Sequence, residues 1–117
     1  MTPGDIHWVE LPAGEGHEQA GRRPAVIIQD DVYASPLPVV LVIPLTGALA
    51  ATRFPGTLAI EPSPENGLRC TSVALAFQLR ALDRQRLREK IGTLTADTLT
   101  ELFTTLDKLM GRTSSLS

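Results

Sequence analysis

The chain has 117 residues, which is enough for one domain with a modest core. Hydrophobic residues make up 43% and charged residues 21%, a composition that excludes an intrinsically disordered chain. The formal net charge of −2 excludes attraction of nucleic acid through overall charge, and a single cysteine, Cys70, excludes an internal disulfide framework and a cysteine-based zinc site.

The sequence contains no segment typical of secretion or of a membrane protein. The N-terminal residues include Asp5 and Glu10 and lack the apolar core of a signal peptide. The longest apolar run, residues 38–45, is shorter than the ~20 residues that a membrane-spanning helix needs. We therefore expect a cytoplasmic protein with no membrane segment.

The first two thirds of the chain predict short strands separated by loops and turns. The expected strands are residues 4–11, 24–29, 39–44 and 57–60, with one or two more in 71–79. Residues 12–21 hold three glycines and no periodicity, which predicts an exposed, mobile loop. Asp30 begins a turn, and residues 62–67 form a second turn cluster.

The last third changes to a helical pattern. Residues 83–90 are short and charged and predict one or two helical turns. Thr95 is a suitable N-cap, and Gly111 a suitable stop, for a helix whose apolar residues recur at helical spacing. We expect this helix to cover one face of a small, strongly curved antiparallel barrel, giving a mainly β (α+β) fold. Residues 1–111 are expected to be one domain, and residues 112–117 a frayed tail.

One segment carries a specific resemblance to a known family. Residues 16–26, GHEQAGRRPAV, closely resemble the signature G-x-E-Q-x-G-x-R-P-x-(V/L) of the MazF/PemK toxins, including the Kid branch. Three further stretches are similar to family elements and follow in the same order, namely GDIHWV (4–9), VIPLT (42–46) and the S-x-x…Q-x-R-x-L-D element within 72–83. The resemblance covers nearly the whole chain, from about Gly4 to Gly111.

The resemblance implies a PemK-like, SH3-type barrel that forms a symmetric homodimer. It implies the toxin of a type II toxin–antitoxin system, an endoribonuclease that cleaves single-stranded RNA at short sequence motifs and so inhibits translation. It further implies attack by the 2′-hydroxyl without a metal or another cofactor, leaving a 2′,3′-cyclic phosphate and a 5′-hydroxyl. The implied partner is an antitoxin whose acidic, partly disordered tail covers the RNA channel.

Four residues are candidates for the chemistry. Arg23 joins a glycine-bearing loop to a proline-led strand, and its charge suits the nonbridging oxygens of a phosphodiester, although it can instead hold the loop through Glu18. Thr46 can donate its hydroxyl to phosphate or serve only as a cap at the end of its strand. His17 and Glu18 are the candidates for proton transfer; we expect Glu18 first to orient the loop or Arg23.

A second group of residues is expected to bind RNA without reacting. These are Gln19, Arg22, Arg53, Gln78, Arg80 and Phe77. Gln78 and Arg80 are expected to share one face of a strand, with a local pair between Arg80 and Asp83 as the alternative for the arginine. Phe77 stands where many family members have an acidic residue, so it is either a core residue, the interpretation we favour, or a base-stacking residue.

Two departures from the family leave other functions open. The acidic residue is replaced by Phe77, and Leu75 stands where the Kid branch has an arginine, so a carboxylate–arginine pair is missing. The first alternative is therefore a barrel with weak or no catalysis that acts by binding a protein, as in the gyrase-poison branch. The second is a general nucleic-acid-binding module, against which the few aromatic residues and the negative net charge argue.

Overall fold

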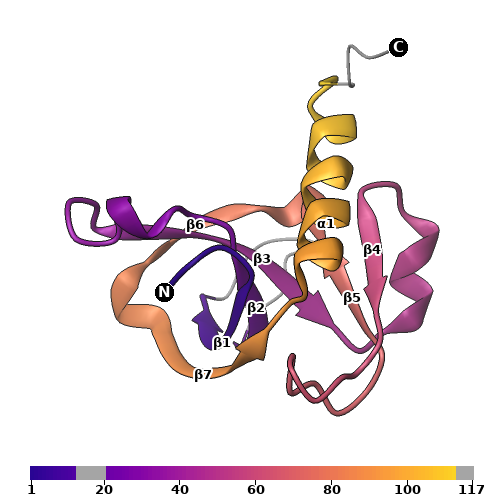
Figure 1. Cartoon of the computed structure of the whole chain (residues 1–117), viewed down its shortest axis with the longest axis horizontal. Helices are drawn as coiled ribbons and strands as arrows, with labels where there is room; N and C mark the ends of the chain where they lie inside the picture. Colours follow the sequence, from indigo (N-terminus) through magenta and orange to yellow (C-terminus); the bar gives the residue numbers. More distant parts are fainter. Residues whose placement is uncertain (13–20, 113–117) are drawn as a thin grey trace.

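The computed structural model describes residues 1–12 and 21–112. In these residues seven antiparallel strands form one curved sheet with the order β4-β5-β3-β2-β1-β7, and β6 pairs with β3 beside this path (Figure 1). The strands are β1 (Asp5–Leu11), β2 (Gly21–Ile27), β3 (Val39–Thr46), β4 (Thr57–Ile60), β5 (Ser72–Leu75), β6 (Arg80–Asp83) and β7 (Leu87–Thr93). The single α-helix of the described residues, α1 (Ala96–Leu109), follows the last strand, so the expected mainly β fold with a C-terminal helix is confirmed.

The central strand β3 changes neighbours along its length, and this change bends the sheet. Its residues 39–42 pair with β6, residues 42–44 pair with β2, and the last two residues, Leu45 and Thr46, pair with β5. β3 therefore belongs to two parts of the sheet, and its end lies where these parts meet.

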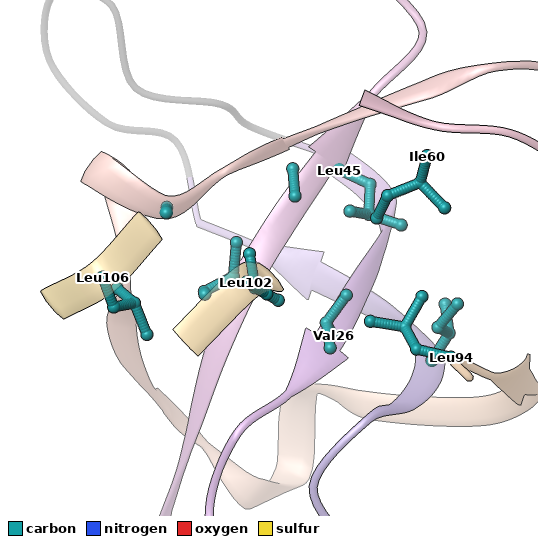
Figure 2. Packing of buried hydrophobic residues seen from close by; sticks show 10 residues of the cluster. Val26, Leu45, Ile60, Leu94, Leu102 and Leu106 are labelled. Atoms are coloured by element: carbon teal, nitrogen blue, oxygen red, sulfur yellow. The ribbon is translucent and has the colours of Figure 1, made fainter. Parts of the chain in front are cut away.

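The core lies on both faces of the sheet because the strands alternate buried side chains to each side. One cluster joins the sheet to α1 and includes Val26, Leu45, Leu102 and Leu106; Figure 2 shows the two helix leucines beside the strand residues. The other cluster fills the opposite face and includes Val9, Ala25, Val42 and Leu82. Side chains one residue apart on a strand, such as Ala25 and Val26, thus enter different clusters.

The helix begins and ends as its sequence predicts. The Thr95 hydroxyl oxygen accepts a hydrogen bond from the Thr98 N–H at 3.2 Å, which satisfies one of the free donors of the first turn. At the other end Gly111 adopts a φ of +72°, a left-handed conformation that ends helices and favours glycine. Lys108 lies in the last turn, where its charge suits the negative end of the helix dipole.

One expected element differs from the structure. The helical turns expected at residues 83–90 are wrong except for one short 3₁₀ turn, Arg84–Arg86; the rest starts β7, which pairs along β1. The expected helical turns rested on the charged residues of this stretch. In the structure, Arg88 and Lys90 instead form ion pairs with Glu10 and Asp5 at the edge of the sheet. The stretch 71–79 gives one strand, β5, as expected, and then a 3₁₀ turn, Ala76–Gln78.

Smaller differences concern the strand bounds. β2 begins at Gly21, three residues before Pro24, and this extension carries both of its arginines. Asp30 caps the short 3₁₀ turn Asp31–Tyr33 by accepting from the Val32 N–H at 3.0 Å, which confirms the expected turn. No helix in residues 1–12 and 21–112 is long and apolar enough to cross a membrane.

Candidate active site

The strand register brings Arg23 and Thr46 to the same part of the molecule. In the β2–β3 pair Ala25 faces Pro44, and this is the last pair before the strands reach the end of β3. Arg23 lies two residues before Ala25, and Thr46 two residues after Pro44, so in an antiparallel pair both side chains leave the same face at the same level. The structure therefore sets the expected catalytic arginine and threonine on neighbouring strands, although 23 residues separate them in the sequence.

Thr46 is held in place by its own backbone segment. Its side chain is 6% exposed, and its hydroxyl oxygen accepts a hydrogen bond from the Ala48 N–H at 3.2 Å. The expected capping role is thus present, but it occupies only an acceptor site of the hydroxyl. The hydroxyl proton remains available to a phosphate oxygen.

A cavity of about 330 Å³ opens beside Thr46. It lies between the end of β3, the 3₁₀ turn Leu49–Arg53 and the segment that follows β5. The described residues that line it are Thr46, Ala48, Ala51, Arg53, Phe54, Leu75, Phe77 and Gln78. None of these described lining residues is acidic, so they offer the cavity no carboxylate.

Two aromatic rings form one wall of this cavity. Phe54 and Phe77 lie with their ring centroids 5.8 Å apart and their planes tilted by 56°. Phe77 is 43% exposed, so the favoured interpretation of this residue as core is wrong. The Arg53 guanidinium lies 4.9 Å from the centroid of the Phe54 ring, which fixes the cation at the cavity rim.

Gln78 and Arg80 reach this region by different elements. Gln78 ends the 3₁₀ turn Ala76–Gln78 and lines the cavity, whereas Arg80 opens β6 and faces Val42 in the register with β3. The expectation that both alternate on one strand is therefore wrong, because the 3₁₀ turn interrupts the strand between them. The alternative pair of Arg80 with Asp83 does not form; the Asp83 carboxylate accepts from the Gln85 N–H at 2.9 Å.

Arg53 is the charged residue of the described cavity lining, and Arg23 and Arg80 lie on the strands β2 and β6. Within residues 1–12 and 21–112, Arg23, Arg53 and Arg80 form no ion pair with a carboxylate. Some cations elsewhere are paired, for example Arg88 with Glu10 at 2.9 Å and Lys90 with Asp5 at 3.4 Å, whereas Arg69, Arg84, Arg86 and Lys108 form no ion pair with a described carboxylate. An arginine without a carboxylate partner can bind an anion such as a phosphodiester.

Arg22 does not join this group. It neighbours Arg23 on β2, so its side chain leaves the opposite face of the strand. There its guanidinium lies 5.1 Å from the centroid of the Trp8 ring and pairs with Glu89 at 2.8 Å. A hydrogen bond from the backbone N–H of Glu89 itself, followed by the hydrogen bond and charge of Arg22, lowers the pKa of the Glu89 carboxyl.

His17, Glu18 and Gln19 lie outside the described residues, so their expected roles in proton transfer and RNA binding rest on the sequence. The structure does show where their segment is anchored, since β1 ends at Leu11 opposite Gly21, the first residue of β2. This end of the β1–β2 pair is also the end that carries Arg23.

The sequence analysis missed Phe54 as a site residue. Its position directly after Arg53 was the available signal, because arginine next to phenylalanine allows a cation–π contact. The observed site thus combines a fixed hydroxyl, unpaired arginines and an aromatic wall. Such a set can hold a phosphodiester and stack a base beside it, which is what cleavage of a single-stranded nucleic acid requires.

Comparison with known proteins identifies proteins that are similar to this chain in sequence and fold. Residues 2–110 match the family of PemK-like, MazF-like toxins of type II toxin–antitoxin systems. The chain is 36% identical over 111 residues to the endoribonuclease MazF of Staphylococcus saprophyticus, a match that covers 95% of this chain and 92% of that protein.

Solved structures show the same fold. The crystal structure of MazF from Deinococcus radiodurans superposes with a TM-score of 0.79 at 30% identity, covering 95% of this chain and 96% of that one. A crystal structure of a MazE–MazF complex from the same organism gives a TM-score of 0.73 at 29% identity, covering 97% of both chains.

Proposed function

Because the chain belongs to the PemK-like, MazF-like family and is an endoribonuclease toxin of a toxin–antitoxin system, we propose that it cleaves single-stranded RNA beside Thr46, with Arg23 and Thr46 as catalytic residues. The observation that supports this assignment is their placement on one face of neighbouring strands, next to a cavity with an aromatic wall. We also propose that the protein acts in the cytoplasm, because its proposed substrate is cellular RNA.

The reaction needs two kinds of help from the protein. The 2′-hydroxyl oxygen attacks the adjacent phosphorus, and the bond from phosphorus to the 5′ oxygen breaks, so negative charge grows on the nonbridging oxygens. The Arg23 guanidinium stabilises this charge because arginine stays protonated at working pH, and the Thr46 hydroxyl donates a second bond. The proton of the 2′-hydroxyl goes to a base, for which Glu18 and His17 are the proposed candidates, and the 5′ oxygen leaves with a proton.

The surrounding residues bind the strand rather than react. Phe77 stacks a base next to the scissile phosphate, Gln78 contacts a base edge, and Arg53 and Arg80 hold neighbouring phosphates. Gln19 contributes from the loop that precedes β2. Arg22 is also expected from the sequence to bind RNA, but its guanidinium lies on the other face of the sheet, next to Trp8 and Glu89.

The activity is tested by incubating the purified protein with a long single-stranded RNA in excess EDTA. We expect discrete fragments that carry 5′-hydroxyl ends, since the proposed chemistry uses only side chains. Fragments with 5′-phosphate ends, or a complete loss of cleavage in EDTA that added Mg²⁺ restores, would contradict the proposed mechanism.

We also propose that two copies of the chain assemble. Leu41 on β3 faces Ala81 on β6, both are exposed, and Leu79 is exposed just before β6, so this face presents an apolar surface that a second copy can cover. Light scattering is expected to give twice the chain mass of 12.6 kDa at micromolar concentration. A mass of one chain under the same conditions would contradict the homodimer.

A cognate antitoxin with an acidic tail is the proposed protein partner. Arg23, Arg53 and Arg80 have no carboxylate partner among the described residues. They can therefore bind the carboxylates of such a tail with the same guanidinium groups that we propose to bind RNA phosphates. In a competition titration we expect the antitoxin to displace RNA; an RNA affinity that stays unchanged when the antitoxin is bound would contradict a shared surface.

A further inference from the structure

A second cavity, of about 290 Å³, lies on the other face of the same sheet end. We call it the Trp8 cavity; its described lining includes Trp8, Pro24, Leu68, Arg69, Cys70 and Lys90. Trp8 faces Pro24 in the β1–β2 register, and Pro24 leaves β2 on the side opposite to Arg23. The proposed catalytic face and the Trp8 cavity are thus back to back across β2.

The two cavities are close to one another around the end of β3. Thr46, which lines the first cavity, pairs with Val73, and the neighbouring Ser72 lines the Trp8 cavity. Gly47 follows Thr46, and a Cβ added to it would lie 3.7 Å from the Cys70 sulfur. Gly47 is exposed and has no side chain, so a nucleic-acid strand can approach its backbone closely between the two cavities.

The chemistry of the Trp8 cavity suits a nucleotide. The Trp8 ring offers a flat apolar surface, with the Arg22 guanidinium 5.1 Å from its centroid. Lys90 is 52% exposed at its side chain although it also pairs with Asp5, and Arg69 forms no ion pair with any described carboxylate. An aromatic surface for the base together with cations for the phosphates is how proteins bind single-stranded nucleic acids.

The wall formed by Leu68 and Arg69 is held rigidly. The buried Asn66 side chain accepts from the N–H groups of Ser63 and Leu68 at 3.0 and 2.9 Å and donates to the Glu61 carbonyl at 2.9 Å. Gly67 comes so close to β7 that an added Cβ would lie 2.5 Å from the Ile91 oxygen. A wall that is already in place costs little ordering entropy when a ligand binds.

We propose that the Trp8 cavity is a second nucleotide subsite, which binds a base and its phosphate from the RNA strand beyond the nucleotides at Thr46. This inference rests on the proposed RNA cleavage and adds to it that the recognised sequence extends past the cleavage site. RNA is favoured over an acidic peptide because the cavity continues the proposed substrate path over Gly47 and offers a ring that a base can stack on.

Trp8 is the only tryptophan of the chain and reports on the subsite directly. The probe is an RNA that carries the mapped cleavage motif, with a 2′-deoxy nucleotide at the attacking position so that it binds without being cleaved. A long form adds nucleotides on both sides, and a short form holds the motif alone. We expect the long form to quench Trp8 fluorescence and to bind more tightly than the short form.

Arg69→Ala is the test variant, and Lys108→Ala, which removes an exposed cation on α1, is the matched control. In Arg69→Ala we expect the ratio of long-form to short-form affinity to fall by roughly tenfold, with a salt dependence reduced by about one charge. Lys108→Ala is expected to keep the wild-type ratio. Trp8→Leu, which keeps an apolar side chain but removes the stacking surface, should lower the ratio in the same way while thermal unfolding confirms that it is folded.

Three results would overturn the subsite. One is binding of the long RNA, seen by fluorescence anisotropy, with no change in Trp8 emission and with equal ratios in Arg69→Ala and Lys108→Ala. Another is that Arg69→Ala weakens antitoxin binding alone, which would assign the cavity to a peptide. The third result is that the wild type neither binds nor cleaves any RNA. This result would contradict the proposed function as well as the subsite, whereas the first two would contradict the subsite alone.

Discussion

In the proposed mechanism the Thr46 hydroxyl serves both the structure and the chemistry. As acceptor it holds the Ala48 N–H, and as donor it is free for a phosphate oxygen. Because it lies in a buried position at the end of β3, its direction is set by the strand and not by a mobile loop.

Thr46→Val separates the two roles when it is compared with Thr46→Ser. Valine keeps the branched shape but removes the hydroxyl, so we expect kcat to fall by about 10²-fold, the usual effect of losing one donor to a developing oxyanion. Serine keeps the hydroxyl and should retain most of the activity. Steady-state cleavage of a short RNA measures both, and a Thr46→Val enzyme with wild-type kcat would show that the residue is only a cap.

Phe77 is the residue of the cavity wall that we propose to stack a base. Its exposed ring beside Phe54 is consistent with base stacking, which is worth ~1–3 kcal/mol. Phe77→Leu keeps apolar volume and loses the flat surface, so KM should rise by about tenfold with a small change in kcat. Phe103→Leu, at a similarly exposed position on α1, is the control; equal KM values for the two variants would contradict stacking.

Among the elements, the turn before β5 depends on a glycine. Gly67 has a φ of +67°, and a Cβ there would lie 2.5 Å from the Ile91 oxygen. Gly67→Ala should therefore lower the free energy of unfolding by more than ~1 kcal/mol. Gly111→Ala is the matched control, with a φ of +72° and no atom within 4 Å, and should cost less in urea unfolding. An equal loss in both variants would show that the contact with β7 contributes nothing.

The elements also show what the sequence can and cannot predict. The apolar periodicity and the Thr95 cap predict α1 correctly, because these signals act within one turn of the chain. The charges of residues 87–90 follow no strand pattern, so the sequence predicts helical turns there. These residues form a strand because they pair with β1, which lies far away in the sequence. The same limit holds for the site: the motif indicates Arg23 and Thr46, whereas Phe54 and the Trp8 cavity depend on contacts between distant segments.

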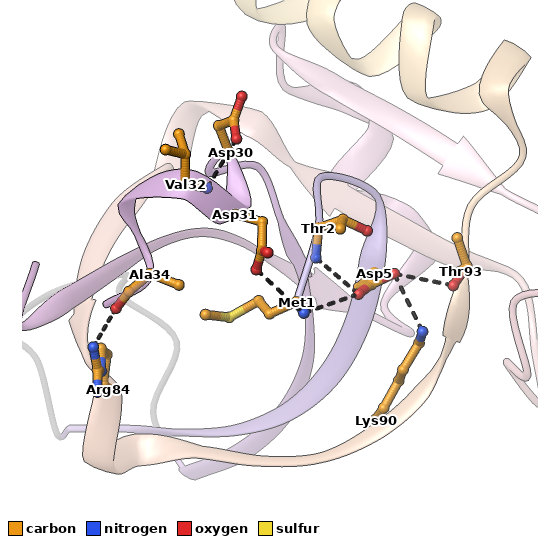
Figure 3. A network of polar contacts seen from close by, with 10 residues as sticks. All are labelled: Met1, Thr2, Asp5, Asp30, Asp31, Val32, Ala34, Arg84, Lys90 and Thr93. Carbon is orange, nitrogen blue, oxygen red and sulfur yellow. Dashed lines mark hydrogen bonds and ion pairs between the residues drawn. The ribbon is translucent and has the colours of Figure 1, made fainter. Parts of the chain in front are cut away.

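At the scale of the whole molecule, the buried Asp5 carboxylate joins β1 to β7 and to the N-terminal residues (Figure 3). It accepts hydrogen bonds from the Thr2 N–H at 2.9 Å and the Thr93 hydroxyl at 3.1 Å, and it pairs with Lys90. Burial alone would raise the pKa of Asp5, but these bonds and the Lys90 charge together hold the pKa below its ordinary value.

A lowered pKa in the folded state links stability to pH. Asp5 contributes its stabilisation above the unfolded pKa of ~4 and loses it as the pH falls through the lower folded value. In urea titrations we therefore expect Asp5→Asn to be less stable than the wild type at pH 7 and the difference to shrink below about pH 4. A difference that is constant from pH 7 to pH 3 would contradict the linkage.

The central claim, that Arg23 stabilises the charge formed during RNA cleavage, is tested most directly by comparing two adjacent arginines. Arg23→Ala and Arg22→Ala remove the same charge from the same strand, but only Arg23 lies on the face of Thr46. With a short RNA in excess EDTA we expect Arg23→Ala to lower kcat by at least ~10²-fold and Arg22→Ala to lower it far less. Equal kcat values for the two variants, with both folded, would contradict the account.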